Sequence, residues 1–292
     1  MNKPEILKLF MTEEKRSKSS LRQLSAVVWS QLKMMLAYKS WLIMDLLSTF
    51  ASVVMYYFVG MQVDPARLSQ SGWGTSYLAF SLVGVATSNY LWACLTRLSH
   101  SIQHEIRGGT LETVAVTPVN MFIFFIGLTA RGYLVSLIYL VGVFTVGVYG
   151  LGAKLLFTPQ SLLLFITLFV LMLVSNQALG LVAAGIIMVY KRGDPLVFIL
   201  AAINEFLAGV LYPLELLKSF PAIRLLSMLF PYTYALDGMR RVLILGASIL
   251  DVNVLTDIVV LGVFSMMLVP IGLKILGWGY NRIRREGTTS SY

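Results

Sequence analysis

Residues 104–118 read HEIRGGTLETVAVTP and separate two long apolar runs, residues 77–96 and 119–150. The quoted stretch carries charged side chains and the pair Gly108–Gly109, whereas the flanking runs are almost free of charge. A helix needs about 20 apolar residues to cross a bilayer. Each run therefore predicts a membrane-spanning helix, and the stretch between them is expected to be a polar turn outside the hydrocarbon layer.

The composition agrees with this interpretation. Of the 292 residues, 57% are hydrophobic and only 13% are charged, whereas a soluble domain is about one quarter charged. The sequence therefore predicts an all-α integral membrane protein. The net charge of +9 fits cytoplasmic loops and anionic lipid headgroups better than nucleic acid, which is not expected as a partner. The single cysteine, Cys94, excludes an intrachain disulfide.

Six segments are long and apolar enough to be predicted as spans: residues 41–60, 77–96, 119–150, 160–189, 195–212 and 256–276. The third is longer than one crossing requires and is divided by Arg131. Residues 119–130 are therefore expected either to lie at the interface or to extend the helix into the cytosol. The fifth segment is short.

The distribution of Lys and Arg predicts the orientation. With a cytoplasmic N-terminus, 16 of the 23 basic residues lie on the cytoplasmic side and six on the other. Because positive charge collects in cytoplasmic loops, both termini are expected inside. The predicted organisation is an N-terminal segment, 1–40, a six-helix domain, 41–276, and a cytoplasmic tail, 277–292, whose last residues, GTTSSY, are expected to be disordered.

The N-terminal segment contains apolar residues at helical spacing. They are Leu21, Leu24, Val28, Leu32, Met35 and Leu36, and most polar residues fall elsewhere on the helical wheel. This pattern predicts a basic amphipathic helix on the membrane surface before the first span, with lipid as its partner. A solvated helix is the alternative.

The segment 213–255 is external in this topology, yet it is too apolar for a loop in water. Pro213, Pro221 and Pro231 prevent it from forming a single span. Backbone at membrane depth that does not cross must be buried in protein or line a cavity. We expect short re-entrant helices that cover the fifth and sixth spans; an amphipathic external domain lying on the headgroups is the alternative.

The segment 97–118 predicts a helix, a glycine break at Gly108–Gly109, and a second helix. The Thr110 hydroxyl can accept a hydrogen bond from a backbone N–H of the second helix, and Glu112 near its start suits the helix dipole. Such an elbow can transmit force from a docked protein into spans two and three. A plain interhelical loop is the alternative.

An absence is also informative. No lysine follows a glycine, so the chain lacks the glycine-rich phosphate loop of ATPases. Any ATP used for transport would be bound by a separate chain.

Two motifs point to a family. The run EIRGGTLETVAVTPV, residues 105–119, resembles the cytoplasmic E-x-x-x-GTLE-x-x-x-x-TPV loop of ABC-2 type transporter permeases. The run from Phe206 to Arg240 resembles the second signature of that family, a Gly and Tyr-Pro after span five and then a Pro-x-Thr-Tyr-x-x-Asp-x-x-Arg pattern. The matching residues of this pattern are Pro231, Thr233, Tyr234, Asp237 and Arg240. With the six spans, the resemblance covers nearly the whole chain.

The resemblance implies the membrane subunit of an ATP-driven exporter in a prokaryotic cell membrane. It implies a homodimer or pseudo-dimer of permeases bound to two cytosolic ATPase subunits, which carry the ATP and Mg²⁺. The cargo would be an amphiphile such as a drug, lipid, glycolipid or polysaccharide. The helix of the N-terminal segment would be an interface helix near the ATPase. The coupling residues would be Glu105, Arg107, Gly108, Gly109, Thr110, Leu111 and Glu112.

Polar residues inside apolar spans are costly and suggest function. Asn204 and Glu205 fall mid-span in the fifth segment, and Asn176 and Gln177 in the fourth. These four residues are candidates for a translocation path. For Glu205 the alternative is a hydrogen-bonded packing pair with Asn204. Asp45 and Arg131, near the cytoplasmic ends of spans one and three, are better explained by snorkelling or by a mutual ion pair.

Two further groups have both a functional and a structural interpretation. Tyr212, Pro213, Pro231 and Tyr234 are candidates for an external gate, although most external aromatic residues are expected to form an interfacial belt. His100 and His104 are one helical turn apart with Glu105 adjacent, but they do not form an H-E-x-x-H pattern, and a solvated or docking face is favoured over a metal site. No catalytic residues, metal or bound cofactor are expected in this chain.

Three rival functions remain at the level of the sequence. An ion-coupled secondary transporter could use Glu205 as its deep acid, although no internal repeat is visible. A membrane-embedded enzyme would need a cluster of catalytic residues that is absent from the sequence. A scaffold would have no need of Asn204 and Glu205 in mid-span.

Overall fold

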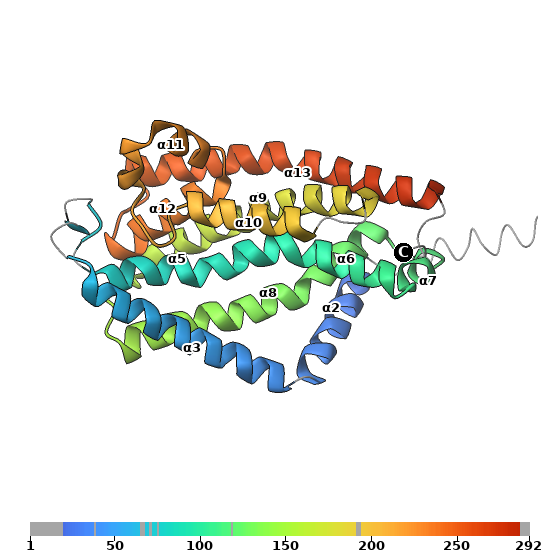
Figure 1. Ribbon diagram of the computed structural model, residues 1–292, viewed down its shortest axis with the longest axis horizontal. Helices are drawn as coiled ribbons and strands as arrows, with labels where there is room; N and C mark the ends of the chain where they lie inside the picture. The colour runs from blue at the N-terminus through green and yellow to red at the C-terminus, as the bar shows by residue number, and fades with distance from the viewer. Residues whose placement is uncertain are drawn as a thin grey trace, which may run out of the picture.

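The computed structural model describes residues 20–37, 39–64, 68–69, 72–74, 76–117, 119–190 and 194–286, and these residues form helices with no strand. The helices form an elongated bundle (Figure 1). The expected segment 1–40 is described only from Ser20, without residue 38, and the tail 277–292 only as far as Glu286. The basic residues Lys191 and Arg192, and the GTTSSY tail, lie outside the described residues.

The element order is α2 (Ser20–Ala37), α3 (Lys39–Gln62), α5 (Tyr77–Trp92), the π-helical turn η1 (Ala93–Arg97), α6 (Leu98–Arg107), α7 (Thr110–Ala115), α8 (Met121–Thr145), the π-helical turn η2 (Val146–Gly150), α9 (Pro159–Tyr190), α10 (Asp194–Leu207), the 3₁₀ helix η3 (Leu214–Ser219), α11 (Pro221–Ser227), α12 (Pro231–Ile244) and α13 (Val252–Glu286). Some helix bounds follow local signals, such as the Asn120 side chain, which accepts a hydrogen bond from Phe122 N at the start of α8.

Four helices in the described part of the chain are long and apolar enough to cross a bilayer: Tyr77–Arg107, Met121–Gly150, Pro159–Tyr190 and Val252–Arg285. Two shorter apolar helices, Phe50–Gln62 and Pro195–Leu207, lie in the first and fifth expected spans. The helical, apolar architecture of a membrane protein is thus present. The count of six spans, the side of each terminus and the re-entrant placement remain predictions.

The third apolar run is a single helix. α8 continues without a break through Arg131 and on into η2. Residues 121–130 are therefore part of the same helix as the rest of the run, and not a separate interfacial helix. The side chain of Asp45 lies outside the described residues, so its expected pairing with Arg131 stays a prediction.

The predicted N-terminal helix is present as α2, and it packs against the bundle. A Cβ on Gly127 of α8 would lie 2.6 Å from Val27, which shows how closely the two helices approach. The backbone N–H of Asn120 donates to Gln23 Oε1 at 3.2 Å. Trp29 and Leu36 are exposed. α2 therefore has one face on protein and another face free for lipid or a partner.

The helices α5, η1 and α6 join into one continuous helix, Tyr77–Arg107, here called the central helix. In its most apolar 18-residue window, 89% of the residues are buried inside the bundle. α9 packs against it so closely that a Cβ on Gly180 would collide with the carbonyl oxygen of Cys94. α9 also packs against α13, where a Cβ on Gly185 would meet Ile275 O at 2.5 Å. Small residues at such contacts let helix backbones approach where the hydrophobic effect is absent.

The proline-broken segment 213–255 folds into η3, α11 and α12, as its prolines predicted. Arg240 anchors α12 in the bundle, and its side chain is buried, with 2% exposed. The guanidinium donates to three backbone oxygens, Phe80 O (3.2 Å), Gly209 O (2.8 Å) and Val210 O (2.5 Å), and lies 3.5 Å from the Phe80 ring centroid. Burial lowers the pKa of Arg240 to about 9, so the side chain is charged at neutral pH.

We expect Arg240→Lys to lower the free energy of unfolding by about 3 kcal/mol. An ammonium cannot replace the planar fork that bonds three carbonyls, and each hydrogen bond to a charged group contributes about 1.5–3 kcal/mol. Thermal unfolding in mild detergent is the measurement. Arg241→Lys is the matched control, because its partly exposed pair with Asp237 is worth at most about 1 kcal/mol. Equal losses in the two variants would contradict this role of Arg240.

Candidate functional site

The elbow predicted around Gly108–Gly109 is present. α6 ends where Gly108 N donates to His104 O at 2.9 Å, and Gly109 has φ +68°. This left-handed conformation suits glycine, and α7 begins at the next residue. Helix, glycine break and helix therefore follow one another as the sequence predicted.

Thr110 plays a different part from the one expected. It is the first residue of α7, and its hydroxyl donates to Glu105 O at 3.2 Å and also bonds the Glu105 carboxylate. The expected cap on the second helix is thus replaced by a contact back to the first helix. This contact fixes the angle of the elbow directly, whereas a cap would have stabilised α7 alone.

The elbow has a buried side and an exposed side. Leu111 is 1% exposed and packs in a cluster with Leu98, Ile102 and Ile106. On α6, His100, His104 and Arg107 are exposed, and Arg107 donates to Gln103 Oε1 at 3.1 Å. The side chains of Glu112 and Pro118 lie outside the described residues. No group of three metal-ligating residues occurs in the described part of the chain.

The polar residues that were expected in mid-span pair across helices. Asn204 Nδ2 donates to Asn176 Oδ1 at 3.2 Å, and both side chains are 0% exposed. Gln177 pairs with the Tyr133 hydroxyl. The proposed packing pair of Asn204 with Glu205 is wrong, because consecutive helical residues are about 100° apart and point to different neighbours. The side chains of Asn176 and Asn204 are fully enclosed by protein.

Glu205 lies at a cavity. Its Oε2 accepts a hydrogen bond of 2.7 Å from Trp92 Nε1 of the central helix. The cavity has a volume of about 280 Å³ and is lined by Tyr56, Ala202, Glu205, Phe206, Val210, Leu211 and Tyr212. A single carboxylate in an apolar cavity can orient a cationic or hydrogen-bonding group of an otherwise apolar ligand. The sequence singled out Glu205 but gave no signal for Trp92.

The four residues of the expected external gate do not lie together in one site. Tyr212 lines the Glu205 cavity and donates to Phe206 O at 2.5 Å. Tyr234 lines a second cavity and donates to Met228 O at 3.2 Å. Pro213 and Pro231 are buried at the starts of η3 and α12. The two prolines therefore fix helix starts, and the two tyrosines belong to different cavities.

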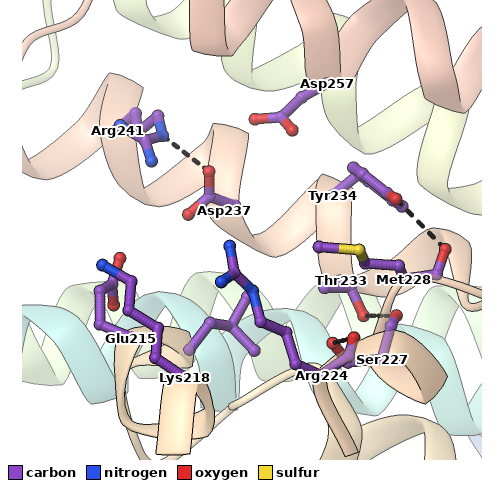
Figure 2. Close-up of a pocket in the computed structure, with 11 residues that line it drawn as sticks. Glu215, Lys218, Arg224, Ser227, Met228, Thr233, Tyr234, Asp237, Arg241 and Asp257 are labelled. Atoms are coloured by element: carbon purple, nitrogen blue, oxygen red, sulfur yellow. Dashed lines mark hydrogen bonds and ion pairs between the residues drawn. The ribbon is translucent and has the colours of Figure 1, made fainter. Parts of the chain in front are cut away.

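The second cavity, of about 190 Å³, lies between η3, α11, α12 and α13, and Figure 2 shows its lining. Asp237 pairs with Arg241 at 2.6 Å; burial raises the pKa of Asp237 and Arg241 opposes that shift. Asp257 at the start of α13 completes this wall. Sequence reasoning missed Asp257, although an acid inside the beginning of an apolar run was a usable signal.

The elbow and the Glu205 cavity are joined by one element. The central helix begins at Tyr77, carries Trp92 beside Glu205, and ends at Arg107 in the elbow. The turn η1 directly follows Trp92, and π-helical turns often occur at functional sites.

Comparison with known proteins adds no relative: no model of a known protein family matches the chain, and no curated protein is significantly similar to it.

Proposed function

We propose that the chain is the membrane-spanning permease subunit of an ATP-driven exporter of the ABC-2 type. The two sequence motifs support this function, and so does the helix–glycine–helix elbow that the first motif forms. Export would move an amphiphile outward, with ATP and Mg²⁺ bound by a separate cytosolic ATPase. The apolar cavity at Glu205 supports a small amphiphilic cargo.

The observation that carries the proposal is the continuity of the central helix between the elbow and Glu205. Its 31 residues measure roughly 46 Å at 1.5 Å per residue, more than the roughly 30 Å of a hydrocarbon core. Its elbow end can therefore protrude to meet an ATPase. A displacement there moves Trp92 and the hydrogen bond to Glu205, which is a direct mechanical link between docking and cargo.

The proposed topology has six spans, both termini in the cytoplasm of a prokaryotic cell, and α11 and α12 re-entrant from the outside. α3 and α10 would be the first and fifth spans. Two permease copies and two ATPase subunits would form the complex, with α2 as an interface helix beside the ATPase. The exposed face of α2, which includes Trp29, supports this placement.

An ion-coupled secondary transporter is the second candidate. The observation in its favour is the carboxylate of Glu205, held at a cavity by Trp92. The two candidates differ in whether an ATPase subunit is required.

We expect native mass spectrometry of the complex from its host, in mild detergent, to show two copies of this 32.5 kDa chain with two ATPase chains. The elbow offers a docking surface, and the chain itself has no phosphate loop. Recovery of the permease alone, with transport that follows a proton or sodium gradient, would replace the exporter with the secondary transporter.

We expect Gly109→Val to reduce ATP-driven export at least tenfold while the complex remains folded. A β-branched residue is disfavoured at φ +68°, so the elbow changes its angle, and no atom lies within 4 Å to clash with the new Cβ. Gly152→Val is the matched control, with φ +71° and equally open space but far from the elbow. Export and ATPase rates are measured for both; equal rates in the two variants would exclude the coupling role.

We expect Glu205→Gln to weaken binding of a cationic amphiphilic dye at least tenfold, with little change in thermal stability. Glutamine can still accept the Trp92 hydrogen bond but supplies no charge. Trp92→Phe is the complementary variant, because it removes the hydrogen bond and keeps the carboxylate. If Glu205→Gln changed stability alone and left dye binding intact, Glu205 would be a packing residue.

A further inference from the structure

The charged cavity between α11, α12 and α13 lies at the end of the bundle opposite the elbow (Figure 1). Its lining carries three acids and three bases: Glu215, Asp237, Asp257, Lys218, Arg224 and Arg241. Such a density of charge is unusual beside helices this apolar, and neither the elbow nor the Glu205 cavity accounts for it. The pairing of these six side chains decides what the cavity can bind.

Three of these six side chains already form an ion pair or a hydrogen bond within the protein. Asp237 and Arg241 form an ion pair of 2.6 Å. Glu215 Oε2 accepts a hydrogen bond of 3.0 Å from Trp73 Nε1. These contacts hold the side chains against the wall of the cavity and neutralise one acid with one base.

In the described part of the chain, Asp257 has one carboxyl oxygen without a hydrogen-bond partner. It is 6% exposed, and its Oδ2 has no hydrogen bond within the described residues. Figure 2 shows its carboxylate pointing into the cavity from α13. A buried polar atom normally finds a partner, because leaving it without one costs about 1–3 kcal/mol and more for a charge. A ligand that donates hydrogen bonds and carries positive charge would satisfy it.

Lys218 and Arg224 supply the opposite charge. They extend from η3 and α11 on the other side of the cavity from Asp257 (Figure 2), and neither has a salt bridge within the described residues. Among the residues described, the cavity therefore presents a buried acid with an unpartnered oxygen on one wall, and two basic side chains with Glu215 beside them on the other. A ligand that matches both walls carries a cationic and an anionic group at once.

The size of the cavity limits the ligand further. At about 190 Å³ it is smaller than the roughly 300–1,000 Å³ of drug-sized pockets. It fits a compact group of a few heavy atoms. Within and around α11, which lines the cavity, Phe220, Leu225 and Leu229 expose apolar side chains, so an apolar tail on the ligand could continue outside the cavity.

We propose that this cavity binds a small zwitterion, whose ammonium pairs with Asp257 and whose anionic oxygens pair with Arg224 and Lys218. The same chemistry occurs in a soluble amino-phosphate and in the headgroup of an aminophospholipid. The site would exist whether or not the chain exports a cargo, since it shares no residue with the Glu205 cavity or the elbow.

Isothermal titration of the detergent-purified full chain with phosphoethanolamine tests the proposal, with ethanolamine and inorganic phosphate as half-ligands. We expect phosphoethanolamine to bind at least tenfold more tightly than either half-ligand. Asp257→Asn should reduce its affinity at least tenfold, and so should the double variant Arg224→Gln, Lys218→Gln on the other wall. Asp251→Asn, at a partly exposed acid just before α13 that is not part of the cavity lining, is the matched control and should bind normally.

Thermal unfolding separates a binding defect from a folding defect. Asp257→Asn should unfold at the same or a higher temperature than the parent chain without ligand, because it removes a buried acid whose Oδ2 has no hydrogen bond to any described residue. The exposed residues Arg224 and Lys218 can change without disturbing the bundle. Affinity for phosphoethanolamine no greater than for phosphate, or unchanged binding in Asp257→Asn, overturns the proposal.

Nanodiscs distinguish the source of the ligand. If the natural ligand is a lipid headgroup, phosphoethanolamine should bind at least tenfold more weakly in nanodiscs of phosphatidylethanolamine than in those of phosphatidylglycerol, because the lipid occupies the site. Equal, Asp257-dependent affinity in both nanodiscs supports the site with a soluble zwitterion as its ligand.

Discussion

The positive charge of Arg240 is the constraint on which the arrangement of this bundle depends. A charge enclosed by helices must find hydrogen-bond acceptors, and here they are the backbone oxygens of Phe80, Gly209 and Val210. Those oxygens belong to the central helix and to the turn that follows α10. One side chain thus joins three parts of the chain, namely α12, the central helix and the turn after α10.

Cross-helix polar contacts of this kind give the bundle its register. Between helices in lipid the hydrophobic effect contributes little, so close packing and hydrogen bonds select the neighbours. The pairs Asn176–Asn204 and Trp92–Glu205 join α10 to α9 and to the central helix. The glycines at Gly180 and Gly185 allow α9 to approach both the central helix and α13. Each contact is specific in a way that aliphatic packing alone is not.

The sequence predicted the features whose causes are local. The glycine break of the elbow, the helix α2 and the breaks at Pro213, Pro221 and Pro231 follow from backbone preferences of neighbouring residues. It did not predict what depends on a distant residue. The partner of Glu205 is 113 residues away, the Thr110 hydroxyl turns back to Glu105, and Asp257 is notable only because α12 and η3 lie against it. Such pairings become visible only when the helices are placed side by side.

The turn η1 allows the central helix to change its register by one residue. A π-helical turn closes with hydrogen bonds from residue i to i+5 and so holds one residue more than an α-helical turn. Conversion of Ala93–Arg97 to α-helix would release that residue and rotate α6 by about 100° relative to α5. Trp92 would keep its orientation together with the rest of α5. His100, His104 and Arg107 on α6 would point in a new direction. The chain thus holds, directly after the residue that bonds Glu205, a one-residue change of helical register that would redirect the elbow without unwinding a helix.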